Sequence, residues 1–463
     1  MNHLDTIAAV STPYGKGGIA VIRISGEDAI SVAEKLFTPQ SGKTLREYAS
    51  SKAIYGYIFH KNGNDPEQID DGIATVFRAP KSFTGEDTVE ISCHGGVLIT
   101  QKVLSATLSA GARLALAGEF TKRAFINGKM TLTGAEALGD LLDAGTDEQI
   151  KLARSGMKGI LSDKTQKIYD SLCSILAAIF AHIDYPDEDL AHVSREEMLS
   201  LAEKEIKNLK TLSNTYSTGH AVAEGVITAI VGRANAGKSS LYNRIVGRDA
   251  AIVTDIEGTT RDVLTEIARL GRVTLKLSDT AGLRESNDKV EMIGIDRARR
   301  EAEQAELILA VFDGSKAPDE SDTAFAQYLR TLDGVKVAII NKSDLGISPE
   351  AEKLVSSFEY SVSISAESGD GIEDLIKTVE NVYIDKDLDM ARDAIVSNAR
   401  QHAAIKEAIE ALEIAKSAIE NDLPLEICCS EIEHSMSALG SIDGRTVSED
   451  IVSQIFSSFC VGK

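Results

Sequence analysis

The sequence predicts a multidomain chain that combines α/β and all-α domains, with one α/β domain inserted into a helical bundle. Its 463 residues correspond to about three domains of ordinary size. β-rich runs alternate with helical spacing near the N-terminus and again in the middle of the chain, whereas the segments around that middle part are helical throughout. Two helical segments separated by a different texture indicate one bundle with an insertion, because the two ends of a domain often lie close together.

Composition and charge narrow the classes of protein further. Apolar residues make up 43% of the chain and charged residues 26%, which excludes a disordered chain, a collagen-like fibre and a small disulfide scaffold. The 49 basic and 71 acidic residues leave a net charge of −22, which argues against a free-standing nucleic-acid binder. If nucleic acid is a substrate, a partner or one local basic face must hold it.

Targeting signals are not apparent. The five cysteines contain no CxxC pair, as expected for reduced thiols. The N-terminus carries Asp5 where a signal peptide would be basic and then apolar. The longest apolar run, 171–183, is shorter than the ~20 residues that span a bilayer. We therefore expect a soluble cytoplasmic protein.

The N-terminal segment, 1–118, is predicted to be a mixed α/β domain. Strands are expected at 19–24, 69–77 and 88–92, and a helix at 97–109.

The helical domain is predicted in two parts, 119–217 and 385–463. Helical spacing covers 135–144, 149–183 and 195–216, with a break at 186–189. In the second part an apolar stripe of Ile405, Ile409, Leu412 and Ile419 lies on one helix face.

The inserted segment, 218–384, alternates strands and helices. Its expected strands are apolar and β-branched, at 226–231, 274–277, 307–312, 336–340 and 360–364. Helical stretches separate most of them, which predicts a largely parallel sheet.

A phosphate-binding loop follows the first of these strands. The run from Gly232 to Ser239 matches G-x-x-x-x-G-K-[ST] and precedes a helical stretch at 240–246. Lys238 would reach the β- and γ-phosphates and Ser239 would coordinate Mg²⁺, while the phosphates lie against the helix N-terminus. The other residues assigned to this loop are Asn235, Ala236, Gly237 and Ser240.

Three more short motifs follow later strands in a fixed order. They are Asp279, Thr280, Ala281 and Gly282; Asn341, Lys342 and Asp344; and Ser365, Ala366 and Glu367. The Asp344 carboxylate can accept hydrogen bonds from the N1–H and N2–H₂ edge of guanine, which adenine does not offer. The inserted domain thus resembles a Ras-like guanine-nucleotide-binding GTPase. Leu283 stands where a water-orienting glutamine is expected, so either hydrolysis is slow or another group substitutes.

The same strings, with others outside the inserted domain, resemble the MnmE (TrmE) family of tRNA modification GTPases. They include 232–239, 258–262, 279–284, 17–26, 82–87, 93–96 and 456–463. The resemblance implies an N-terminal domain that binds 5-formyl- or 5,10-methylene-tetrahydrofolate, and a helical domain interrupted by the GTPase. It also implies a homodimer whose GTPase domains pair in a potassium-dependent way. With the partner MnmG, which carries FAD, the family modifies carbon 5 of the tRNA wobble uridine.

The resemblance also assigns roles to individual residues. Potassium ligands fall on Asn235, Thr254, Ile256 and Thr259, within a loop that also contains Asp255, Glu257 and Gly258. Thr260 joins Ser239 on Mg²⁺, and K⁺ would neutralise charge on the phosphates as an arginine finger does. Glu291 matches the family's water-orienting acid, although an exposed helix-start glutamate would carry the same residue type.

Folate contacts, in the same way, fall on Arg23, Glu90, Lys129 and Lys463. Apolar residues at 455–459 predict that the C-terminal tail is docked. Cys460 is either a catalytic thiol or a small buried hydrophobe. Cys93 and His94 lack a further ligand cluster nearby in the sequence, so we interpret them as part of a structural turn.

Two kinds of function stay open on the residues alone. One is a tRNA-modifying GTPase whose nucleotide cycle drives a folate-using complex. The other is a GTPase switch, such as a ribosome-assembly factor, whose flanking domains only bind a partner; a membrane-associated signalling GTPase would lack an anchor. Because a chain with a net charge of −22 repels a polyanion such as tRNA, we expect the tRNA to be held largely by MnmG.

Overall fold

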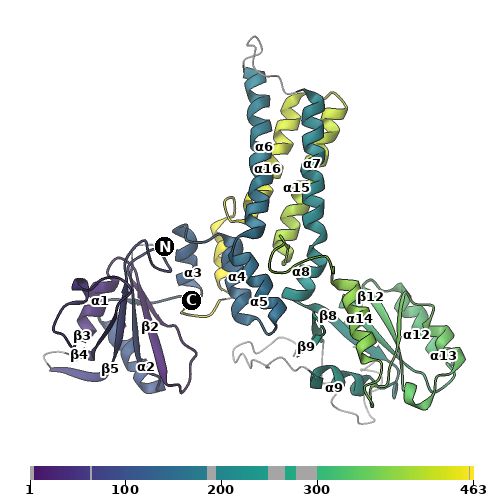
Figure 1. Ribbon diagram of the computed structural model, residues 1–463, viewed down its shortest axis with the longest axis horizontal. Coiled ribbons are helices and arrows are strands. Elements are labelled where there is room, and N and C mark those ends of the chain that lie inside the picture. Colours follow the sequence, from purple (N-terminus) through teal and green to yellow (C-terminus); the bar gives the residue numbers. More distant parts are fainter. Residues whose placement is uncertain are drawn as a thin grey trace. The chain divides into compact units, whose positions relative to one another are not determined.

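The computed structural model describes residues 5–62, 65–184, 194–248, 266–277, 300–457 and 459–462. The chain folds into two compact units, one formed by 1–139 with 440–463 and the other by 140–439 (Figure 1). Within the described residues, no helix has the length and apolar character needed to cross a membrane.

The first unit is built on a seven-stranded sheet in the order β3-β4-β5-β6-β2-β1-β7. Neighbouring strands are antiparallel except β1 and β7. The strands are β1 (Ile7–Val10), β2 (Ile19–Ser25), β3 (Phe37–Pro39), β4 (Ala53–Asn62), β5 (Asp65–Phe77), β6 (Thr88–His94) and β7 (Arg113–Leu114). The predicted strands at 19–24, 69–77 and 88–92 are confirmed as β2, β5 and β6.

The two faces of this sheet differ because apolar and polar residues alternate along its central strands. Ile22, Ile24 and Ile91 are buried in a core with α1 (Ala29–Leu36) and α2 (Val97–Ser109), and a short 3₁₀ turn, η1 (Leu45–Glu47), adds Leu45 to it. Arg23 and Glu90 face the opposite side. On that side α3 (Glu119–Ile126) places Phe120 in a small cluster with Ile7, Ala9 and Ala115.

The C-terminal tail packs on the first unit, as the sequence predicts. Phe456 of α17 (Glu449–Ser457) is buried with Leu132 and Ala135 of α4 (Leu132–Asp143), and Phe459 packs on the same cluster. Beyond the helix, Val461 forms an isolated β-bridge with Ala117.

The second unit contains a six-stranded sheet in the order β13-β12-β11-β8-β10-β9. All neighbours are parallel except β10 and β9, so the predicted largely parallel sheet is confirmed. The strands are β8 (Val226–Gly232), β9 (Glu266–Leu270), β10 (Val273–Leu277), β11 (Leu307–Asp313), β12 (Val335–Asn341) and β13 (Tyr360–Ser363). Both faces carry apolar clusters, which is why the inner strands are continuous apolar runs.

Helices flank this sheet: α9 (Lys238–Arg248), α12 (Glu320–Thr331), α13 (Pro349–Val355) and α14 (Ile372–Tyr383), with a 3₁₀ turn η2 (Ser343–Leu345). Local sequence sets their starts. At the start of α12 the Asp319 carboxylate accepts hydrogen bonds from the backbone N–H groups of Ser321 and Asp322. At the start of α13 the Ser348 hydroxyl accepts one from the backbone N–H of Ala351, and Pro349 is the first residue of the helix.

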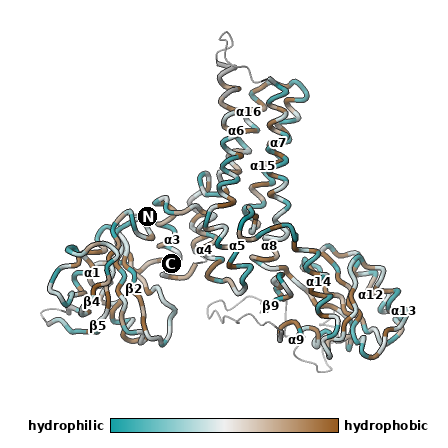
Figure 2. The backbone as a smooth tube through the Cα atoms, in the orientation of Figure 1, coloured by the Kyte–Doolittle hydropathy of each residue, from teal (hydrophilic) through white to brown (hydrophobic). Residues whose placement is uncertain are grey.

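The remaining helices of the second unit are α5 (Asp147–Met157), α6 (Ile160–Asp184), α7 (Arg195–Asn214), α8 (Tyr216–Ala223), α15 (Ala399–Glu420) and α16 (Leu425–Ile442). Hydrophobic and hydrophilic residues alternate along them, as expected for amphipathic helices (Figure 2). The helical spacing predicted at 149–183 is confirmed, and Gly159 at φ +76° divides this segment into α5 and α6.

Candidate functional site

The phosphate-binding loop lies between β8 and α9, as the motif predicts. Asn235 and Gly237 both have positive φ, +62° and +98°, so the backbone doubles back before α9 begins at Lys238. Asparagine and glycine tolerate this left-handed region better than other residues. The loop therefore ends at a helix N-terminus, where backbone N–H groups and the helix dipole favour a phosphate.

Lys238 folds back over this loop. Its Nζ donates a hydrogen bond of 2.9 Å to the carbonyl oxygen of Arg233. Burial lowers the pKa of Lys238, because no described carboxylate pairs with the ammonium group there. A phosphate would supply the missing negative charge.

Asn341 joins the three described motifs into one pocket. Its side chain is buried, and Nδ2 donates to the Ala236 carbonyl oxygen at 2.9 Å while Oδ1 accepts from the Ala366 backbone N–H at 2.9 Å. Gly237 approaches so closely that an added Cβ would lie 2.0 Å from Asn341 Nδ2. The loop before α9, the end of β12 and the segment after β13 are thereby held in one arrangement.

The two segments that the sequence assigns to base recognition are held by two basic side chains, Lys342 and Arg244. Lys342 Nζ lies 2.7 Å from Asp313 Oδ2 at the end of β11. Burial raises the pKa of Asp313, but hydrogen bonds from Lys342 and Ser315 outweigh it, and the net pKa is lowered. Arg244 of α9 donates to the backbone carbonyl oxygens of Ala366 and Glu367. Asp344 itself is exposed on the 3₁₀ turn η2.

Several predicted residues of this site lie outside the described residues. They are Thr254, Asp255, Ile256, Glu257, Gly258, Thr259 and Thr260; Asp279, Thr280, Ala281 and Gly282; and Glu291. Their assigned roles stay predictions. Ser239, Ser240 and Ser365 are described, and Ser365 is fully buried, accepting at Oγ from the Ser368 backbone N–H at 3.2 Å.

In the first unit, Arg23 and Glu90 lie opposite each other on adjacent strands. Arg23 Nη2 is 2.8 Å from Glu90 Oε1, and the guanidinium stacks over Phe83 and Phe120, with its carbon 5.5 Å and 5.7 Å from the ring centroids. Both side chains keep partial exposure, 21% and 28%. A cation and a carboxylate are thus available together beside two aromatic rings.

Lys129 contacts the loop that carries Phe83, the ring over which the Arg23 guanidinium lies. Its Nζ donates to the Pro80 carbonyl oxygen at 2.8 Å, and its stem packs beside Gly85, in the loop that also carries Phe83. Cys460 is exposed, and its carbonyl oxygen accepts from the Gly118 N–H at 3.3 Å. Because its side chain is exposed, Cys460 is not the small buried hydrophobe that was the alternative to a catalytic thiol. Lys463 lies outside the described residues.

A charge network around the buried Arg123 in this unit was not predicted from the sequence. Arg123 is 5% exposed and contacts Asp5, Glu86 and Glu119 at 2.7, 3.2 and 3.1 Å. Arg113 pairs with Asp5 and Glu119 at 2.7 Å each. Glu86 also accepts from Ser25 Oγ at 2.8 Å, so the network anchors the 82–87 loop to the sheet. The spacing of Glu119 and Arg123, one helical turn apart, was the available signal.

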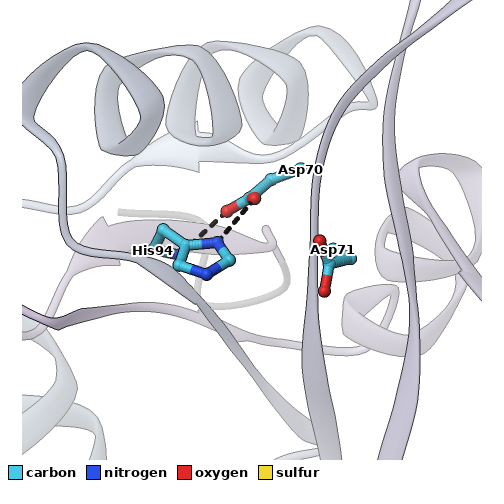
Figure 3. Close-up of side chains that lie close together, drawn as sticks. All are labelled: Asp70, Asp71 and His94. Atoms are coloured by element: carbon cyan, nitrogen blue, oxygen red, sulfur yellow. Dashed lines mark hydrogen bonds and ion pairs between the residues drawn. The ribbon is translucent and has the colours of Figure 1, made fainter.

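His94 also has partners that its sequence neighbourhood does not reveal. Asp70 and Asp71 of β5 bring their carboxylates near the His94 ring, with ligand-type atoms of all three residues within 4.8 Å of one another (Figure 3). The interpretation of His94 as part of a turn alone is thus incomplete. Cys93 faces the core, where burial raises the pKa of its thiol to about 11 and makes it a poor nucleophile.

Comparison with known proteins covers nearly the whole chain. The N-terminal family described as "GTP-binding protein TrmE N-terminus" matches residues 6–129, and "MnmE helical domain" matches residues 132–460. The tRNA modification GTPase MnmE of Clostridioides difficile (strain 630) is 39% identical over 99% of both chains. The Bacillus subtilis (strain 168) protein of the same name is 38% identical over 99% of this chain and 100% of its own length. On this breadth of similarity, the chain belongs to the MnmE family of tRNA modification GTPases.

Proposed function

We propose that this GTPase acts with an FAD-dependent MnmG partner to modify carbon 5 of the wobble uridine in certain tRNAs. The one-carbon unit would come from a tetrahydrofolate, and the product would be an aminomethyl or carboxymethylaminomethyl group. GTP hydrolysis would drive the pairing of GTPase domains in a homodimer. The observation that carries the proposal is that one chain of this family combines a phosphate-binding loop bonded to the Asn341 segment with a partly exposed Arg23–Glu90 pair on the sheet of the first unit.

The oxygen atoms around the phosphate-binding loop are of the kind that would bind the metal ions of GTP. Ser239 opens the first turn of α9 and would hold Mg²⁺ together with Thr260. Asn235 turns left-handed at the rim of the loop, where a side-chain oxygen and neighbouring carbonyl oxygens are the kind of donors that a K⁺ ion takes. When bound, these ions would neutralise charge on the phosphates. Lys238 adds a fixed positive charge, and Glu291 would orient the attacking water.

The sheet face suits a folate in a similar way. A pterin offers an amide-like edge that a carboxylate such as Glu90 can bind, and the glutamate tail of the cofactor suits cations such as Arg23 and Lys129. Phe83 and Phe120 beside Arg23 add apolar surface for a flat ring. The ion pair would be exchanged for contacts to the ligand.

Replacing Arg23 by alanine is expected to weaken tetrahydrofolate binding by about 10-fold or more, since one charge-assisted hydrogen bond contributes ~1.5–3 kcal/mol. The dissociation constant for 5-formyl-tetrahydrofolate, measured by calorimetry, checks this. Arg46→Ala is the matched control, because Arg46 is 62% exposed and pairs with Glu34 on another part of the unit. Equal folate affinity of the Arg23→Ala variant and the wild type would remove the folate site from this face.

The complete reaction is tested on tRNA from cells that lack the protein. Purified protein, the FAD-dependent partner, GTP, Mg²⁺ and 5,10-methylene-tetrahydrofolate with an amine donor are combined in KCl. We expect mass spectrometry to detect the aminomethyl-type group on the wobble uridine. In NaCl of equal ionic strength we expect GTP hydrolysis to slow by about 100-fold, comparable to losing one preorganised electrostatic contact.

The two outcomes are separable. A wobble uridine that stays unmodified in the complete KCl reaction would contradict the proposed function. An unchanged rate of hydrolysis in NaCl would leave tRNA modification standing but would remove the role given to Asn235 and to residues 254–260.

A further inference from the structure

His94 is held by a single carboxylate at two points, one on its ring and one on its backbone. Asp70 Oδ1 lies 2.7 Å from His94 Nδ1, and Asp70 Oδ2 accepts from the His94 backbone N–H at 2.8 Å (Figure 3). Asp70 is 9% exposed, whereas the His94 side chain is 64% exposed. Because an ionised carboxylate only accepts, Nδ1 carries the proton in the neutral ring, and Nε2 is then the acceptor nitrogen.

A backbone irregularity places Asp70 for this contact. In the β4–β5 ladder Ile58 pairs with Asp70 and Phe59 with Gln68, so Ile69 is an extra residue in β5. A β-bulge of this kind changes the direction of side chains and is common beside active sites. Here it lies immediately before Asp70, and consecutive residues 70 and 71 both reach the His94 region.

The arrangement favours an oriented imidazole over a metal centre. Both Asp70 oxygens already accept hydrogen bonds from His94. Asp71 Oδ2 accepts from the Tyr55 hydroxyl at 3.0 Å. A metal ion would compete with these contacts for the carboxylate oxygens. A histidine that transfers protons instead needs its two contacts with Asp70, because they orient the ring and set its tautomer while Nε2 points away from Asp70.

His94 shares a sheet face with the Arg23–Glu90 pair. Along β6, Glu90, Ser92 and His94 alternate with the buried Val89, Ile91 and Cys93. Four residues of strand separate Glu90 from His94, roughly 13 Å at about 3.3 Å each. A ligand held at Glu90 and extending along β6 would therefore approach Nε2.

We propose that His94, positioned by Asp70, is the proton-transfer residue of the one-carbon step; this inference rests on the proposed function. His94 Nε2 accepts the proton released when the amine nitrogen bonds to the one-carbon unit. It then returns this proton to the folate nitrogen whose bond to that carbon breaks. One carbon–nitrogen bond forms, one breaks, and no oxidant or net proton is consumed.

The charges around the ring agree with this role. The hydrogen bond that His94 donates to Asp70 raises the pKa of His94, and the charges of Asp70 and Asp71 add to the effect. Other titratable groups also face this pair of aspartates: Tyr55 of β4 donates to Asp71, Tyr57 pairs with Asp71 across the ladder, and the charge of Asp70 acts on the Cys93 thiol of β6. A raised pKa makes the neutral imidazole a stronger base for the proton that the amine releases.

The test compares His94→Gln and Asp70→Asn with the wild type in the reconstituted reaction. We expect His94→Gln to slow wobble-uridine modification by about 100-fold or more, with GTP hydrolysis and folate affinity unchanged. His434→Gln is the matched control, because His434 is also half-exposed and pairs with a carboxylate, Glu407, at 2.9 Å. Modification at the wild-type rate by His94→Gln would overturn the inference; no modification by the wild type would instead overturn the proposed function.

A second readout separates proton transfer from a structural role. In the ligand-free protein, the His94 ring nitrogens are titrated by NMR. We expect Asp70→Asn to lower the pKa of His94, because the raising charge is lost. If His94 must first accept a proton, modification falls as pH drops through its pKa, and this fall should move to lower pH in Asp70→Asn. A pH profile that does not move with the His94 pKa would overturn the inference.

Discussion

Replacing Lys238 by alanine is expected to lower GTP hydrolysis by about 100-fold or more, through both nucleotide affinity and the chemical step. The ammonium group lies within the phosphate loop, 2.9 Å from the Arg233 carbonyl oxygen, and its burial already depresses its pKa. A bound phosphate would replace this weak contact by charge-assisted hydrogen bonds, each contributing ~1.5–3 kcal/mol in a partly desolvated site. Alanine removes all of them.

Single-turnover hydrolysis and the affinity for a fluorescent GTP analogue measure the two effects separately. Lys353→Ala is the control, because Lys353 is an exposed lysine on α13 of the same domain and its loss should change neither quantity. Lys238→Arg keeps the charge but spreads it over a larger planar group, so we expect only partial recovery. Retention of more than about one tenth of the activity by Lys238→Ala would contradict the role that its contacts assign to Lys238.

The inserted domain was predictable because its signals are local. Buried parallel strands require continuous apolar runs, so β8, β11 and β12 stand out against the polar helices beside them. The phosphate loop follows from eight consecutive residues. The predicted domain limits at 118, 217 and 384 remain predictions, since texture changes gradually along the helices.

The first unit was harder to predict because its order depends on long-range pairing. β3 has three residues and β7 two, too few for a periodic pattern, and each is stabilised by a neighbour distant in sequence. The helix break at Gly159 was missed because the apolar spacing continues on both sides of it. Local pattern did not distinguish one long helix from two.

In the candidate site, too, the local motifs were predictable from the sequence and the long-range contacts were not. The Asn341 motif was predicted, but its bond to Ala236 joins residues 105 positions apart and depends on the assembled sheet. The pairing of His94 with Asp70 depends on a bulge that shifts the register of β5, which no short motif encodes. The three carboxylate partners of Arg123 and Arg113 likewise come from three separate segments of the first unit.

Replacing Asp344 by asparagine is expected to change which base the pocket prefers. The carboxylate can accept from both N1–H and N2–H₂ of guanine, and losing the two charge-assisted bonds, at ~1.5–3 kcal/mol each, predicts a fall in GTP affinity of about 100-fold or more. Xanthine carries a carbonyl oxygen in place of that amino group. The asparagine amide can donate to this oxygen and accept from N1–H, so affinity for XTP should rise.

Calorimetry with GTP, XTP and ATP measures the exchange, and Asp333→Asn is the control, since Asp333 is an exposed aspartate outside the pocket. The fold should tolerate the change, because Asp344 is exposed on a 3₁₀ turn whereas the neighbouring Asn341 is buried and bonded at both ends. Loss of GTP affinity with gain of XTP affinity can only come from contact with the base edge, since a general disruption would weaken both. Unchanged discrimination between GTP and XTP would mean that guanine is recognised elsewhere, and the pocket assigned to Asn341, Asp344 and Ala366 would have to be reassigned.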